Sequence, residues 1–320
     1  METDLAKYGI TAKLPEVFDD SFVGNYLDCE RMAYYQTILG RRSKWAEDYN
    51  LVWGKVFHKV AEVWSKTGEV QDVMEIISSN LEEENDDRYG RNQFKMQEAF
   101  LAWAKFRVAD PIQILRAEQP AVVACLDQAC PYSDHGCGLT YGGKLDQIVR
   151  WQAMVGPLDF KTTVRDESDP ISEFKPSHQM EGYVWLTSHL MGKHCWGVIV
   201  ERIIANKSKI KVDRFPIPSS KDQIREWVAT ERITHDEIQR KFVNHANNEL
   251  HWKQNKHRCA QPYMCRFRDV CLSPQEFEFR YRWLRDNTRE DRFDFRKDDK
   301  ASAPGSPDEI TTNTTYVRGG

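Results

Sequence analysis

The residues best suited to chemistry are an aspartate and a lysine that lie two positions apart in the segment Gly156–Lys161. Because side chains alternate along a strand, Asp159 and Lys161 would project from the same face. Asp146 stands earlier, at the end of a neighbouring predicted strand, and a hairpin would bring its carboxylate beside that of Asp159. Two carboxylates at one point suit a hard divalent cation. With the lysine, they could supply what phosphodiester hydrolysis requires: neutralised phosphate charge, an activated water and a stabilised leaving oxygen.

An isolated D-x-K pattern is more often a solvated strand face, so its companions matter. Gly54 and His58 lie on one face of a predicted helix, where the imidazole can project beside a close-packed neighbour. Gln179 and Tyr183 share a face of the helix that follows the D-x-K strand, and could hydrogen-bond to a base or a phosphate. Taken singly, each of these would be a structural or packing residue.

Four short motifs therefore follow one another along the chain: G-x3-H ending at His58, G-x2-D ending at Asp146, D-x-K ending at Lys161 and Q-x3-Y ending at Tyr183. Their order and their expected secondary structure resemble the RecB-type and CRISPR-adaptation-type exonucleases of the PD-(D/E)XK superfamily. The Pro-Asp of the superfamily name is interrupted here, because Leu158 separates Pro157 from the aspartate.

The resemblance implies a catalytic Mg²⁺ or Mn²⁺. Its ligands would be His58, Asp146, Asp159 and, through its backbone carbonyl, Phe160. The resemblance makes Lys161 the residue that positions or activates the water. It assigns substrate contact or ordering of the site to Gln179 and Tyr183. Glu118, on the preceding strand, is a candidate for an additional acidic site residue.

Three cysteines near the C-terminus are evenly spaced, with five residues between neighbours: Cys259, Cys265 and Cys271. Such spacing without a secretion signal favours metal ligands over disulfides. In the nucleases that the chain resembles, one N-terminal and three C-terminal cysteines hold a 4Fe-4S cluster, which makes Cys29 the fourth ligand. The common pattern has two residues between the first pair, not five. From the residues alone, zinc and metal-free buried thiols remain alternatives.

The other cysteines follow no ligand pattern, and no function is assigned to them: Cys125, Cys130, Cys137 and Cys195. A cluster that includes Cys29 would close a loop of more than two hundred residues. It would join the first helix to the last ordered segment. A cross-link that closes so long a loop restricts the unfolded chain most.

The hydrophobic pattern predicts an α/β chain in the order helices, three strands, helix, two strands, helix. The resemblance implies a restriction-endonuclease-like fold, with a central mixed sheet flanked by helices. We expect helices over 21–38, 51–64 and 86–109, strands over 112–126, 142–151 and 153–162, a helix over 176–191, a hairpin over 196–217 and a long helix over 220–256. One nuclease domain would span 1–275: a helical part over 15–110, the catalytic sheet over 111–219, and the long helix and cysteine cluster over 220–275. A charged extension over 276–300 and a disordered tail over 301–320 would follow.

The composition is that of a globular protein, since hydrophobic residues make up 40% and charged residues 29% of 320. The chain has neither a membrane-length apolar run nor a basic leader, so we expect a cytoplasmic protein and no membrane partner. Its net charge of −4 does not indicate a nucleic-acid binder, but local basic groups can contact phosphates. Two such groups occur, at 41–44 and 207–211, and the second could instead be a solvated hairpin edge.

The function that unites these motifs is a DNA exonuclease or end-processing nuclease in recombination, repair, or phage and mobile-element DNA metabolism. No G-x4-G-K-[ST] phosphate loop is present, so a helicase or recombination protein would be its partner. One alternative is a catalytically inactive nucleic-acid-binding or assembly module that keeps the metal cluster. Another is a zinc-stabilised interaction protein whose carboxylates are coincidental.

Overall fold

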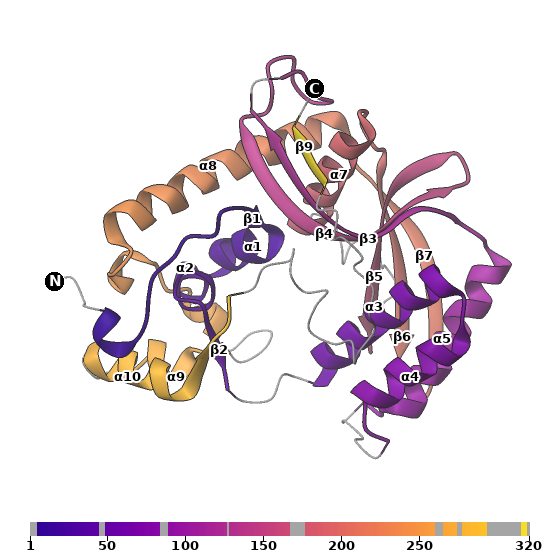
Figure 1. The fold of residues 1–320 in the computed structure, drawn as a ribbon, viewed down its shortest axis with the longest axis horizontal. Coiled ribbons are helices and arrows are strands. Elements are labelled where there is room, and N and C mark those ends of the chain that lie inside the picture. The colour runs from indigo at the N-terminus through magenta and orange to yellow at the C-terminus, as the bar shows by residue number, and fades with distance from the viewer. Residues whose placement is uncertain are drawn as a thin grey trace, which may run out of the picture.

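The chain was analysed as a computed structural model that describes residues 5–44, 49–83, 89–126, 128–166, 177–259, 265–273, 277–292 and 315–318. At its centre is a seven-stranded sheet (Figure 1). Its strands are β1 (Phe18–Asp19), β3 (Gln113–Cys125), β4 (Leu139–Trp151), β5 (Met154–Thr163), β6 (Gly197–Ala205), β7 (Ile210–Pro218) and β9 (Thr315–Arg318).

The strand order is β7-β6-β5-β4-β3-β9, and β1 pairs with the start of β4. Neighbours from β3 to β5 are antiparallel, β5 and β6 are parallel, and β6 and β7 form an antiparallel hairpin. The sheet is therefore mixed. Parallel pairing of β5 with β6 requires a crossover, and α7 (His178–Met191) lies in that connection.

Helices cover both faces of the sheet (Figure 1). On one face, α3 (Tyr49–Thr67), α4 (Val70–Asn80) and α5 (Gln93–Ala109) bury a core that includes Phe57, Trp103 and Phe160. On the other face, α7 and α8 (Lys221–His245) bury Trp185, Trp227 and their neighbours. The expected α/β fold with a mixed sheet flanked by helices is confirmed.

A third core joins N-terminal elements to elements that follow α8, and the first turns of the chain lie beside α9 and α10 in Figure 1. The N-terminal elements are η1 (Leu5–Tyr8), α1 (Asp20–Asp28), α2 (Glu30–Ala33) and the π-helical η2 (Tyr34–Ile38). The C-terminal elements are η3 (Glu249–His251), η4 (Lys256–Cys259), α9 (Arg268–Cys271) and α10 (Phe277–Asn287). Strand β2 (Arg41–Ser43) pairs with β8 (Thr288–Glu290) and fixes this arrangement.

The structure differs from the expected elements at several places. The predicted helix over 21–38 is broken at Cys29, whose backbone is extended (φ −164°, ψ 104°). The predicted helix over 220–256 ends at His245, where residues 246–248 turn the chain toward η3. Helix α4 was not predicted. Of the tail, residues 301–314 and 319–320 lie outside the described residues, and Thr315–Arg318 pairs with β3 as β9.

Candidate active site

The candidate site forms where β4 and β5 separate. Their ladder runs from the turn at Trp151 and Met154 to the pair Gln147 and Leu158. The next residues on the two strands are Asp146 and Asp159, and both carboxylates are buried. Because β5 continues beside β6 after it leaves β4, Asp159, Phe160 and Lys161 remain in regular strand geometry. The fold thus brings the two predicted carboxylates together at the point where the strands separate.

His58 reaches this point from α3. Its Nδ1 lies 3.0 Å from Asp146 Oδ1, while the other oxygen of Asp146 accepts the Phe160 N–H at 2.9 Å. The helix can approach closely because Gly54 has no side chain: a Cβ there would lie 3.1 Å from Thr162 Oγ1. Gly54 therefore sets the distance between α3 and β5, one helical turn before His58.

Lys161 begins a second chain of contacts. Its Nζ lies 2.9 Å from Asp159 Oδ2 and donates to Gln179 Oε1 at 2.7 Å. Gln179 Nε2 in turn donates to the Tyr183 hydroxyl at 3.0 Å, along one face of α7. Helix α7 thus positions Lys161, which lies between Gln179 and Asp159.

The two aspartates have opposite electrostatic environments. Burial alone would raise the pKa of Asp146, but the His58 charge and hydrogen bond and the Phe160 N–H outweigh it and hold this pKa below its ordinary value. Burial raises the pKa of Asp159, and Lys161 offsets this only in part. Although burial opposes charge on the two cations, Asp146 raises the pKa of His58, and Asp159 raises that of Lys161.

The donor set fits a hard divalent cation. Two carboxylates, an imidazole and a backbone carbonyl are oxygen and nitrogen donors of the kind that Mg²⁺ and Mn²⁺ accept. Asp159 Oδ2 is buried and, among the described residues, accepts no well-aligned hydrogen bond even though Lys161 is near. Such an oxygen is satisfied by a cation. His58 turns Nδ1 to Asp146, which leaves Nε2 as the nitrogen for a ligand.

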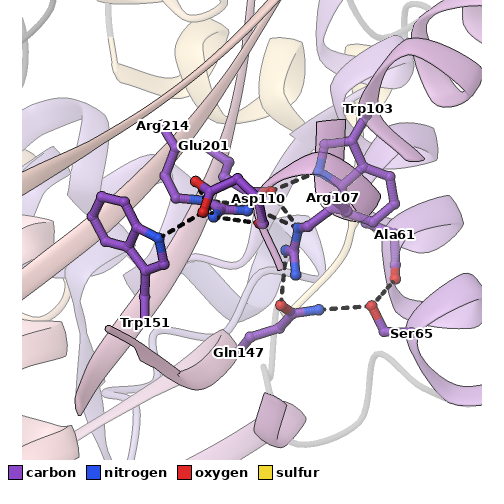
Figure 2. A network of polar contacts seen from close by, with 9 residues as sticks. All are labelled: Ala61, Ser65, Trp103, Arg107, Asp110, Gln147, Trp151, Glu201 and Arg214. Atoms are coloured by element: carbon purple, nitrogen blue, oxygen red, sulfur yellow. Dashed lines mark hydrogen bonds and ion pairs between the residues drawn. The ribbon is translucent and has the colours of Figure 1, made fainter. Parts of the chain in front are cut away.

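A buried polar network lies behind this site (Figure 2). Glu201 on β6, opposite Phe160, accepts from Trp103 Nε1 at 2.6 Å, Arg107 Nε at 2.9 Å and Arg214 Nε at 2.7 Å. Arg107 also donates to Gln147, the residue after Asp146. The network ties α5, β4, β6 and β7 together beneath the strands that carry the carboxylates.

A neighbouring cluster was not predicted from the sequence. His178, the first residue of α7, lies 2.9 Å from Asp20 Oδ1 and hydrogen-bonds to Glu231 on α8. Asp20 begins α1, and its charge acts on both Lys161 and Tyr183. No motif marks these residues, because each comes from a different helix. Together they fix the start of α7 beside the site.

The aromatic and basic residues near the site have varied roles. Trp53 is fully buried and lies 4.6 Å under the Arg91 guanidinium, so it belongs to the core. The side chain of Glu118 lies outside the described residues. Arg41 is also buried and donates to Thr288, so it cannot track a phosphate backbone. In the 207–211 group, Lys209 and Lys211 form ion pairs at the surface.

The four cysteines of the expected cluster line one cavity between the ends of the chain. Cys29 lies in the break between α1 and α2, Cys259 ends η4, Cys265 follows the undescribed residues 260–264, and Cys271 ends α9. Two sulfurs accept hydrogen bonds: the Asn255 N–H reaches Cys29 Sγ at 3.4 Å, and Gln254 Nε2 reaches Cys271 Sγ at 3.0 Å. Burial raises the pKa of the Cys271 thiol to about 11, and the neighbouring thiols contribute.

A second group of cysteines also converges: Cys125, Cys130 and Cys137, together with His189. This group could not be predicted from the sequence, because its spacing matches no common ligand motif and its histidine lies on a later helix.

Over residues 21–272 the sequence matches the PD-(D/E)XK nuclease superfamily, and the chain belongs to that superfamily, a class of metal-dependent nucleases. No curated protein sequence matches it. One solved structure, titled "Crystal structure of SSO0001", is similar at 14% sequence identity with a TM-score of 0.30, covering 72% of this chain and 82% of that one. In the described part of the chain, no helix combines the length and apolarity needed to cross a bilayer.

Proposed function

We propose that this protein is a Mg²⁺- or Mn²⁺-dependent deoxyribonuclease of the RecB-type branch, acting as an exonuclease or end-processing enzyme. The observation that carries the proposal is the meeting of Asp146, Asp159, His58 and Lys161 where β4 and β5 separate. His58, Asp146, Asp159 and the Phe160 carbonyl would hold the cation. When bound, it supplies charge neutralisation on the phosphate and lowers the pKa of water.

Lys161 has a defined role in this proposal. Its pKa is raised despite burial because Asp159 lies beside it, so before the cation binds the side chain is an ammonium. It can donate hydrogen bonds to the attacking water or to the phosphate, and Gln179 fixes its direction. Tyr183 has a pKa raised far above 10 by burial, so it acts as a neutral hydroxyl that orients Gln179 or the substrate.

The class of reaction is tested with labelled linear single-stranded DNA, linear double-stranded DNA and a closed circle, each incubated with Mn²⁺, Mg²⁺ or EDTA. We expect loss of the linear substrates only with a metal, while the circle persists because the enzyme requires an end. Cutting of the circle would replace the exonuclease assignment with an endonuclease. If no DNA is cut under any condition, the proposed activity is wrong.

We further propose that Cys29, Cys259, Cys265 and Cys271 hold a 4Fe-4S cluster. Their shared cavity and the N–H donors aimed at two of the sulfurs support this, since such bonds stabilise thiolate ligands. The cluster would join the break after α1 to α9, and its role would be structural.

Anaerobic purification tests the cluster. We expect a brown protein with about four iron and four sulfide per chain, in line with the cluster type, and Cys265→Ser to lose both. Cys195→Ser is the matched control, because this buried cysteine lies outside the cavity. A colourless wild type that holds zinc at these four thiols would replace the cluster with a zinc site.

A further inference from the structure

The connection between β3 and β4 gathers three cysteines that the nuclease site does not use. Cys125 ends β3, and Cys130 and Cys137 lie in the loop that leads to β4 at Leu139. His189 faces them from the last turn of α7. One ligand atom from each of the four residues lies within 4.8 Å of all the others. Thiolates bound to one tetrahedral zinc at ~2.3 Å are roughly 3.8 Å apart, so this grouping matches a single ion.

The loop backbone supports the convergence of the sulfurs. Residues 130–133 form a tight turn in which Cys130 and Ser133 bond to each other through both backbone groups. Inside that turn the Tyr132 N–H donates to Cys130 Sγ at 3.4 Å, and the Cys137 N–H donates to Cys125 Sγ at 3.2 Å. Backbone N–H groups aimed at sulfur stabilise thiolates, as the outer contacts of metal sites do.

Two glycines shape the second half of the loop. Gly136 and Gly138 have φ values of 81° and 63°, in the left-handed region that favours glycine. They flank Cys137 and turn its sulfur toward Cys130, which lies 3.1 Å away. That separation is longer than a disulfide bond, and both thiols are free.

His189 has the hydrogen bonding of a metal ligand. Its Nδ1 lies 2.8 Å from the Trp185 carbonyl oxygen, which requires the proton to be on Nδ1 and leaves the lone pair on Nε2. Nε2 is buried and, among the described residues, accepts no N–H or O–H hydrogen bond; only the Cys125 thiol interacts with the ring. A buried imidazole nitrogen without an N–H or O–H partner is costly, and a bound cation removes that cost.

We propose that Cys125, Cys130, Cys137 and His189 form a structural zinc site, separate from the nuclease centre and from the cavity of the four other cysteines. Four protein ligands close the coordination sphere, so the ion has no open position for catalysis. It anchors the β3–β4 connection to the C-terminal turn of α7, whose first turns carry Gln179 and Tyr183. Binding releases the protons of the three thiols.

The test is metal analysis of the full chain grown with added zinc, with iron measured in the same samples. We expect about one zinc per chain in the wild type, and at least about a tenfold loss in Cys130→Ser and His189→Ala, since even outer contacts of a site are worth roughly 10–100-fold in affinity. Cys195→Ala is the matched control, because this cysteine is buried in the same core but is not part of the group; it should keep its zinc. Cys265→Ser should lose iron and keep zinc.

A second measurement needs no variant. Native wild-type protein is treated with a thiol-alkylating reagent before and after a chelator, and the labelled peptides are identified by mass spectrometry. The proposal predicts that Cys125, Cys130 and Cys137 are protected until the chelator is added. It is overturned if the native protein contains less than about a tenth of a zinc per chain, or if Cys130 and Cys137 are found joined in a disulfide.

Discussion

At the residue scale, the two carboxylates of the site contribute differently to stability. Asp146 is stabilised as a carboxylate by His58 and by the Phe160 N–H, whereas burial disfavours the charge of Asp159 even with Lys161 beside it. A carboxyl whose pKa is lower in the folded than in the unfolded protein stabilises the fold at pH values above its unfolded pKa. A carboxyl whose pKa is higher in the folded protein destabilises the fold in the same pH range. The site therefore holds one carboxylate that favours folding and one that opposes it.

This contrast predicts opposite effects of two isosteric substitutions at pH 7 in EDTA. Asp159→Asn should raise the free energy of unfolding, because it removes an unfavourable buried charge. Asp146→Asn should lower it by about 1–3 kcal/mol, because His58 and Phe160 lose a charged acceptor. Urea denaturation of both variants and the wild type measures this. Destabilisation by Asp159→Asn would contradict the assignment.

His178 gives the protein a separate pH dependence. Burial opposes its charge, but hydrogen bonds to Asp20 and Glu231 outweigh burial and raise its pKa from 6.5 to about 9. Protonated His178 thus stabilises the fold fully below pH 6.5, and the contribution is lost as the pH rises through 9. Between these values the wild type should lose up to about 3 kcal/mol more stability than His178→Asn. Equal pH profiles of unfolding for the two proteins would show that the cluster is not charged.

At the element scale, the distance between α3 and β5 depends on Gly54. In Gly54→Ala the new Cβ would lie 3.1 Å from Thr162 Oγ1, so the helix must move by a few tenths of an ångström and carry His58 with it. Alanine favours the helix by about 1 kcal/mol, so stability should not fall. Nuclease activity should drop several-fold to about tenfold, because small displacements at a site are costly.

The matched test of this spacing is the double variant Gly54→Ala with Thr162→Ala, which removes the contacting oxygen. Activity should return to the level of Thr162→Ala alone. If the double variant stays as impaired as Gly54→Ala, the effect arises elsewhere than in the contact between α3 and β5.

The network behind the sheet predicts a stability effect. Glu201→Gln keeps the shape but leaves Arg107 and Arg214 as buried cations without their shared carboxylate. Breaking such a group by removing one partner costs about 3–5 kcal/mol. Thermal unfolding should show the loss, and Glu226→Gln, on the exposed face of α8, should leave the unfolding temperature unchanged. A Glu201→Gln protein as stable as the wild type would show that the arginines find other partners.

Helices and strands whose hydrophobic residues recur at a regular spacing could be predicted from the sequence. The positions where a helix breaks or ends could not. The strands β3 to β7 alternate or run apolar between turn residues, and their expected ranges fall within a few residues of those observed. The break at Cys29 changes only one residue's backbone, so the apolar pattern runs through it. Helix α8 ends at His245 without a Gly or Pro to mark the end.

The same contrast holds for the site. Spacing within one strand or helix predicts that Asp159 and Lys161, or Gln179 and Tyr183, share a face. It does not predict that Asp20, His178 and Glu231 meet, because three separate helices bring them together.

At the scale of the whole molecule, the central sheet with its helices and the third core form two distinct parts of the fold. The mixed sheet and its two layers of helices form the nuclease core, and the third core packs the N-terminal elements against α9 and α10 (Figure 1). Of the four cysteines that line the cavity, Cys271 belongs to this third core and Cys265 packs against it. A cross-link between segments so distant in sequence stabilises the fold by restricting the unfolded chain, without touching the carboxylates.

The central claim is that this fold builds a metal-dependent DNA-cutting centre from Asp146, Asp159, His58 and Lys161. The most direct measurement is the initial rate of degradation of end-labelled linear DNA in Mn²⁺ by the wild type, Asp159→Asn and the exposed control Asp222→Asn. We predict that Asp159→Asn lowers the rate at least about 100-fold while remaining folded, because it removes charge from the centre, and that Asp222→Asn matches the wild type. Wild-type cleavage that persists in Asp159→Asn would contradict the account.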